Sequence, residues 1–378
     1  RGAAPIMAIA IALLLIVVAS VAFHVVTPWW LTPLASDWGQ MDLTIDITMW
    51  VTGFFFVAIN LFVVYALWRF RHREGRRAAY QADHKRLERW LIGITSVGIA
   101  ALLAPGLVVY AKFVDPPADA MMLEVLGQQW QWRFRLPGAD GRFGRTDARF
   151  VAANNPFGID PADPDAQDDL LVDGNEVHLP RARPVKVVLR SHDVLHDFFV
   201  PQFRARMNIV PGQVSWFWFT PTHDGRYESM CAQLCGVGHP NMRGYVRVEA
   251  EDAFAAWRSR LPTFAASLDP KAAAAPGGDL VARGRALGAS KGCVACHSND
   301  GRPGIGPTWK HLFGRNETME DGSTALVDEA FVRGIIRDPK SRDIKGFPQV
   351  MPQVPMSDDE LDALVAYIRS LGAAPGRP

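Results

Sequence analysis

Residues 231–242 read Cys-Ala-Gln-Leu-Cys-Gly-Val-Gly-His-Pro-Asn-Met and gather two potential thiolates, an imidazole and a thioether in a single turn-rich loop. A loop with that many soft or borderline donors favours copper over hard cations, which prefer oxygen ligands. One ligand is still missing, and His196 is the candidate because it follows the β-rich run 185–190 upstream of the loop. The sequence therefore predicts a copper-binding loop.

Two alternative roles for Cys231 and Cys235 remain open at this point. A disulfide between them would be ordinary chemistry outside the cytosol, but it leaves the regularly spaced His and Met unexplained. A mononuclear blue copper site needs only one Cys.

The second cysteine pair lies in Cys293-Val-Ala-Cys296-His297, a pattern typical of covalent c-type haem attachment. All four cysteines of the chain are then used by metal centres. Because both kinds of centre are assembled outside the cytosol, we expect a bacterial periplasm or its equivalent.

The copper loop, with the spacing C-x3-C-x3-H-x2-M and a D-V-x-H segment before it, resembles the binuclear copper A centre of cytochrome c oxidase subunit II. The resemblance implies two copper ions that share two bridging thiolates. The implied ligands are Cys231 and Cys235 as bridges, His196 and His239 on one copper each, Met242 as a weak ligand, and the backbone carbonyl of Gln233.

Gln233 is a departure from the family pattern. Most members have Glu there, and its carboxylate joins a magnesium site shared with subunit I. A neutral amide is a poor ligand for a hard divalent cation, so Gln233 weighs against that magnesium site.

Residues 1–111 form a predicted membrane region with three apolar runs of spanning length, at 5–26, 45–68 and 90–110. The first run also fits a signal peptide, because residues 19–22 are small. We expect it to be a retained helix.

The orientation of this region follows from the positive-inside rule. Residues 69–89 carry eight Lys or Arg, whereas residues 27–44 carry none and include three Trp. The basic loop is therefore expected in the cytoplasm of a bacterium, with the chain embedded in the lipid of the inner membrane and residues from 112 onward in the periplasm.

Glu88 lies where the basic loop meets the third apolar run. Leu87-Glu88 followed by Trp90 resembles the family segment in which a Glu stands at the entrance of a proton pathway into subunit I. The alternative is a solvated charge at the cytoplasmic edge of the membrane.

Residues 112–260 are expected to form an all-β, cupredoxin-like sandwich, because short strand signals alternate with turns. Within it, the stretch 127–134 is similar to an aromatic segment of the family whose first Trp is where electrons enter the copper centre. Trp130 is the matching residue, and an ordinary core or interface aromatic is the alternative. The Asp-rich segment 138–175 is expected to be a solvated loop rather than a calcium site.

Residues 261–278 are rich in Ala, Pro and Gly and are predicted to be a linker. Residues 279–378 resemble an all-α class I cytochrome c, which implies thioether bonds from Cys293 and Cys296 and His297 as proximal ligand. Gly346-Phe-Pro-Gln-Val-Met-Pro resembles the family motif around the sixth ligand, and this favours Met351. Met319 and Met356 are then packing residues.

Together these features indicate a multidomain chain resembling subunit II of a caa-type haem-copper oxidase. Such a subunit passes electrons from its haem to copper A and on to subunit I, where oxygen is reduced to water and protons are pumped. The expected partners are subunits I and III, with a periplasmic cytochrome c or a bc-type complex as donor. The net charge of +1 argues against a nucleic-acid partner. The alternatives are the corresponding subunit of a copper A nitric oxide reductase and a stand-alone periplasmic electron carrier.

Overall fold

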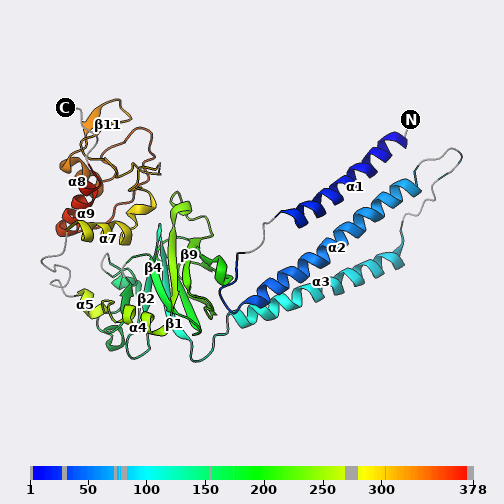
Figure 1. Cartoon of the computed structure of the whole chain (residues 1–378), viewed down its shortest axis with the longest axis horizontal. Coiled ribbons are helices and arrows are strands. Elements are labelled where there is room, and N and C mark those ends of the chain that lie inside the picture. The colour runs from blue at the N-terminus through cyan, green and yellow to red at the C-terminus, as the bar shows by residue number, and fades with distance from the viewer. Residues whose placement is uncertain are drawn as a thin grey trace. The chain divides into compact units, whose positions relative to one another are not determined.

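The computed structural model describes residues 3–27, 32–71, 75, 77, 83–152, 155–172, 174–268, 280–302 and 304–372. The chain forms two units (Figure 1): one comprises Arg1–Leu34 and Trp38–Phe113, and the other comprises Ala35–Asp37 and Val114–Pro378. Residues 35–37 belong to the second unit because Ala35 is hydrogen-bonded to the backbone of that unit. Ala35 N donates to Gln202 O at 2.8 Å, and Ala35 O accepts from Thr222 N at 2.9 Å.

The first unit consists of the helices α1 (Ala3–Val26), α2 (Gly39–Arg69) and α3 (Lys85–Phe113). All three are long and apolar enough to cross a membrane, by length and composition. α2 and α3 extend beyond the apolar runs expected at 45–68 and 90–110. An apolar run marks the hydrocarbon span, whereas helical hydrogen bonding continues into polar ends such as Lys85 to Arg89.

The second unit begins with a β-sandwich, which confirms the predicted fold class. One sheet has the order β3-β2-β1-β5-β8 and the other β4-β10-β9-β6-β7. The strands of the first sheet are β1 (Met121–Gln128), β2 (Gln131–Leu136), β3 (Leu170–Val172), β5 (Val185–Ser191) and β8 (Ser215–Phe219). Those of the second are β4 (Glu176–Pro180), β6 (His196–Val200), β7 (Ala205–Ile209), β9 (Gly225–Cys231) and β10 (Arg243–Glu249).

Alternation of side chains along the strands builds the core between the two sheets. In β5, Val185, Val187 and Leu189 are buried, whereas the residues between them are only partly buried. Phe134 on β2 packs edge-on against Phe198 on β6, with ring centroids 6.5 Å apart. This core makes one end of the sandwich a rigid base for the loop of residues 231–242.

The Asp-rich segment is only in part the solvated loop that the sequence predicts: residues 139–142 and 161–162 are exposed, but other positions are buried. Asp169 is fully buried, and its Oδ2 accepts hydrogen bonds from Arg135 Nη1 and Gly144 N, both at 3.0 Å. Arg135 is itself buried on β2 and also pairs with Glu124 at 2.5 Å. A buried guanidinium is energetically costly unless carboxylates pair with it. The loop therefore folds inward, where Asp169 pairs with Arg135.

The start of the predicted linker also belongs to the sandwich, which has a short helix α4 (Glu251–Arg258) after its last strand. Phe264 opens the helix α5 (Phe264–Leu268), is fully buried, and donates its backbone N–H to Asp169 O at 2.7 Å. The Ala- and Pro-rich composition of this segment gave no sign that Phe264 is buried. Residues 269–278 of the predicted linker lie outside the described residues.

The C-terminal part contains the helices α7 (Leu280–Ser290), α8 (Glu329–Arg337) and α9 (Asp358–Ser370) and a hairpin of β11 (Asn316–Thr318) and β12 (Thr324–Leu326). α7 packs closely on α9, since a Cβ at Gly284 would lie 1.9 Å from Ala363 O. The predicted capping box of Ser357 and Glu360 is present at the start of α9. These helices enclose a separate apolar core around Trp309.

Candidate metal centres

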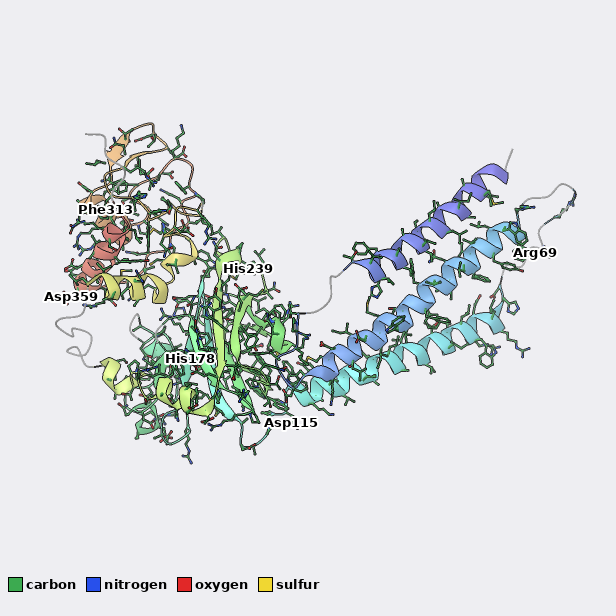
Figure 2. The ribbon with its side chains drawn as sticks, viewed as in Figure 1. Arg69, Asp115, His178, His239, Phe313 and Asp359 are labelled. Carbon is green, nitrogen blue, oxygen red and sulfur yellow. The ribbon has the colours of Figure 1, made fainter. Side chains whose placement is uncertain are left out.

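The six candidate copper ligands converge at one end of the sandwich, where Figure 2 labels His239. His196 begins β6, Cys231 ends β9, and the other four lie between β9 and β10. The Sγ atoms of Cys231 and Cys235 are 3.6 Å apart, well beyond the bond length of about 2.05 Å in a disulfide. The pair therefore forms the centre of the cluster as two free thiols.

The remaining four donors are arranged around the two sulfurs, two beside each. His196 Nδ1 lies 3.9 Å and Gln233 O 3.1 Å from Cys231 Sγ. His239 Nδ1 lies 3.6 Å and Met242 Sδ 3.9 Å from Cys235 Sγ. This donor set of two thiols, two imidazoles, a thioether and a backbone carbonyl suits copper.

The electrostatics of the thiol pair favour metal binding. A hydrogen bond with Cys235, with help from His196 and backbone groups, lowers the pKa of Cys231 below that of an ordinary thiol. The same interaction, together with burial, raises the pKa of Cys235. Copper binding would release the protons that the two thiols still hold, because cysteine binds metal as the thiolate.

Asp193 is a member of the site that the sequence reasoning missed. Its Oδ1 lies 2.8 Å from His196 Nε2, and its Oδ2 accepts a hydrogen bond from Gln129 N at 2.8 Å. Because His196 donates from Nε2 to this carboxylate, its Nδ1 is the ring nitrogen that faces the thiols and would bind a metal. The signal was available, since Asp193 is the Asp of the D-V-x-H segment.

Replacing Asp193 by alanine is expected to weaken copper binding about 10- to 100-fold, because His196 loses the partner that orients its ring. Copper titration of the folded, metal-free protein measures this change. Asp224→Ala is the matched control, since that exposed carboxylate pairs only at the surface, with Arg181 at 2.9 Å. Equal copper affinities for the two variants would contradict the role of Asp193.

Trp130 lies against the metal loop. It occupies the two-residue connection between β1 and β2, and its indole Nε1 donates to the carbonyl of Cys235 at 3.1 Å. Gln129 Nε2 donates to the same carbonyl at 2.7 Å. Trp132, two residues later, instead fills the core, edge-on to Phe198. Trp130 is thus hydrogen-bonded to the backbone of one candidate ligand, whereas Trp132 lies edge-on to another, His196, with ring centroids 6.2 Å apart.

The haem-attachment segment presents His297 in the form that binds iron. Its Nδ1 donates to Pro307 O at 2.8 Å, which leaves Nε2 free, and the ring stacks on Trp309 with centroids 5.4 Å apart. Desolvation lowers the pKa of His297 and so favours the neutral imidazole. Gly306 permits this position, because a Cβ there would lie 2.6 Å from His297 Cε1.

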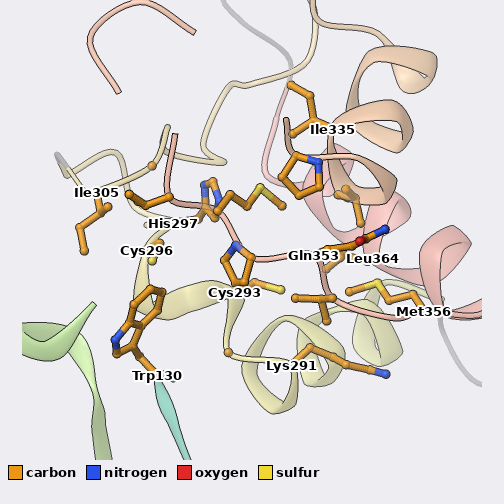
Figure 3. A pocket seen from close by; sticks show the side chains of 18 of the residues that line it. Trp130, Lys291, Cys293, Cys296, His297, Ile305, Ile335, Gln353, Met356 and Leu364 are labelled. Carbon is orange, nitrogen blue, oxygen red and sulfur yellow. The ribbon is translucent and has the colours of Figure 1, made fainter. Parts of the chain in front are cut away.

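A cavity opens beside His297, and its lining includes Cys293 and Cys296 together with apolar side chains of α8 and α9, such as Ile335 and Leu364 (Figure 3). An apolar cavity with two thiols and an imidazole fits a covalently bound haem. Both Met351 and Met356 line it, whereas Met319 is buried in the adjacent core. The choice of Met351 as sixth ligand stays a prediction.

Glu88 and Gln233 are the two remaining candidate residues. Glu88 lies in the first turn of α3 with its side chain exposed. Gln233 directs its backbone carbonyl toward Cys231, which is the role expected of it, and its side chain is partly buried. Neither geometry bears on a proton pathway or a magnesium ion.

A β-sandwich with soft copper ligands at one end, followed by a haem-binding helical domain, defines a redox protein of the electron-transfer class. Residues 121–249 match the family described as the periplasmic domain of cytochrome c oxidase subunit II, and residues 281–372 match the cytochrome c family. The chain belongs to the cytochrome c oxidase subunit II family.

The chain is also similar to several individual proteins. The alternative cytochrome c oxidase subunit 2 of Bradyrhizobium diazoefficiens is 54% identical over 259 residues, which are 68% of this chain and 94% of the relative. Cytochrome c oxidase subunit 2 of Cereibacter sphaeroides is 28% identical over 55% of this chain and 74% of its own length. A crystal structure of the periplasmic domain of subunit II from Bradyrhizobium japonicum is 25% identical, covers 38% of this chain and 94% of its own, and has a TM-score of 0.28.

Proposed function

We propose that this chain is the subunit through which electrons enter a terminal cytochrome c oxidase, from its own c-type haem to copper A and on to the haem-copper subunit. That subunit reduces oxygen to water and pumps protons. The observation that carries the proposal is the convergence of all six candidate copper ligands on a chain that also holds a haem-attachment segment.

Bound copper and haem would supply one-electron redox chemistry, and the chain's residues make that chemistry fast and directed. The thiols of Cys231 and Cys235 are buried, which excludes water from the sulfurs. His196 is held by Asp193, and the sandwich limits movement of the loop, so little has to rearrange when an electron arrives. Trp130 touches the loop at the Cys235 carbonyl and is the proposed point at which electrons enter.

Carrying the donor on the same chain changes the kinetics of the transfer. A tethered cytochrome meets the copper domain at a high effective concentration, so the encounter no longer depends on the concentration of a soluble partner. The immediate donor to this chain, a periplasmic cytochrome c or a bc-type complex, then needs to reduce only the haem held by Cys293, Cys296, His297 and Met351.

The proposed location is the bacterial inner membrane, with the copper and haem domains in the periplasm. The three apolar helices and the basic loop 69–89 support this orientation. Subunit I is the partner that the family implies, and subunit III is a further proposed partner. Glu88 is proposed as the entrance of a proton pathway, on its resemblance to the family segment. Gln233 leaves no carboxylate for a magnesium ion there.

Replacing His239 by alanine in the intact complex is expected to stop electron flow between the haem and subunit I, because a copper ligand is lost. An external donor should still reduce the haem. Oxygen uptake should fall further than the about 10- to 100-fold loss that follows removal of a residue that only hydrogen-bonds a metal ligand. Haem absorbance and oxygen uptake, recorded together, measure this.

His223→Ala is the matched control, since His223 is exposed and bonds to the neighbouring Thr222 hydroxyl. Reoxidation of the haem in His239→Ala at the parent rate would contradict the proposed order of transfer.

Assaying the same complex with oxygen and with nitric oxide separates an oxidase from a copper A nitric oxide reductase.

A further inference from the structure

We propose that Gly238 is a positioning residue that seats the indole of Trp130 on the copper loop, a role that the ligand spacing C-x3-C-x3-H-x2-M does not assign. This inference rests on the proposed function, in which electrons enter the copper centre at Trp130. The proposed action of Gly238 is through the tryptophan.

The first observation is steric. A Cβ built on Gly238 would lie 2.2 Å from Trp130 Cδ2, 2.5 Å from Cγ and 2.6 Å from Cε3, all closer than real Cβ contacts. Cγ is the ring atom attached to the Trp130 Cβ, so no movement of the ring tip relieves this overlap. The whole side chain must leave its rotamer to make room for one methyl group.

The second observation is that the backbone at Gly238 does not itself require glycine. Its φ of −82° and ψ of 1° are open to any L-residue, as at the third position of a type I turn. Gly236, two residues earlier, has φ of +115° and does require glycine. The glycine at position 238 is therefore explained by the indole that lies against it.

The third observation is that both partners are held in place. Trp130 is only 9% exposed and donates its N–H to the Cys235 carbonyl, as described above. The loop is closed by its own hydrogen bonds, from His239 N to Gly236 O at 3.1 Å and from Asn241 N to Gly238 O at 3.0 Å. Because neither side yields easily, an added methyl group has to displace the indole from the Cys235 carbonyl.

The test compares four forms of the intact complex: the parent, Gly238→Ala, Trp130→Ala and the double variant. For each, the copper absorption spectrum reports the metal site, and the rate of electron transfer from photoreduced haem to copper reports the path. We expect Gly238→Ala to slow transfer on the order of tenfold with an unchanged copper spectrum, since misplacements of about 1 Å cost up to about 100-fold. In the Trp130→Ala background the second substitution should change nothing further.

A parent-like rate and spectrum in Gly238→Ala would overturn the inference, as would an equal loss of rate in the Trp130→Ala background. Should Gly238→Ala fail to load copper, removing the indole must restore loading in the double variant, and failure to do so also overturns it. A parent-like rate in Trp130→Ala contradicts the proposed role of Trp130 instead. Gly334→Ala is the matched control, because a Cβ there meets nothing within 4 Å.

Discussion

Replacing Met351 by leucine is expected to leave the haem attached but without its sixth ligand. The proposed attachment residues Cys293 and Cys296 and the proposed proximal ligand His297 are untouched by this change, so we expect an unchanged haem content. Loss of the sulfur ligand removes the factor that raises the haem potential, and axial ligands shift haem potentials over a range of about 0.8 V. We expect the midpoint potential to fall by tenths of a volt, measured by redox titration, with an optical change from low-spin to high-spin haem.

Met356→Leu and Met319→Leu are the matched controls. Met356 also lines the cavity, and Met319 is buried in the core beside it, so each variant changes the same kind of side chain nearby. Both should keep a low-spin haem at nearly the parent potential, since a swap between Met and Leu of similar volume costs little. A parent-like potential in Met351→Leu, together with a large shift in Met356→Leu, would reassign the ligand to Met356.

Truncating Trp132 to alanine is expected to lower the free energy of unfolding of the copper domain by about 3–5 kcal/mol. Trp132 is 1% exposed and lies edge-on to Phe198, at 5.1 Å, and to the candidate ligand His196, at 6.2 Å. A cavity at this position therefore removes both core packing and support for the metal site. Urea unfolding of the copper-loaded protein, followed at the copper absorption, measures the loss.

Two further variants make this result specific. Trp132→Phe keeps an aromatic ring and removes a buried indole N–H that finds no hydrogen-bond acceptor among the described residues, so its cost should be smaller. Val214→Ala, at a side chain that is 55% exposed, should change the free energy of unfolding by no more than about 0.5 kcal/mol. A loss below about 1 kcal/mol in Trp132→Ala would mean that the inter-sheet core does not depend on this ring.

Most of the fold class was predictable because its signals are local. Runs of apolar residues mark the three helices of the first unit, alternation marks strands such as β5, and Ser357 with Glu360 marks the start of α9. Two segments contain buried residues that the sequence did not predict, for the same reason. Their composition is polar or Ala-rich, but Asp169 and Phe264 turn inward to partners far away in the sequence, which composition does not report.

For the candidate site too, the features that were predictable are those with a local signal in the sequence. By itself, the sequence determined the family resemblance and the identity of the candidate donors, because ligand chemistry depends on residue type and short spacings. Only the tertiary structure decided which atoms meet: the Asp193 carboxylate at His196 Nε2, the Trp130 indole at the Cys235 carbonyl, and Gly238 beneath that indole. The last two contacts join residues more than 100 positions apart, which only the packing of the two sheets brings together.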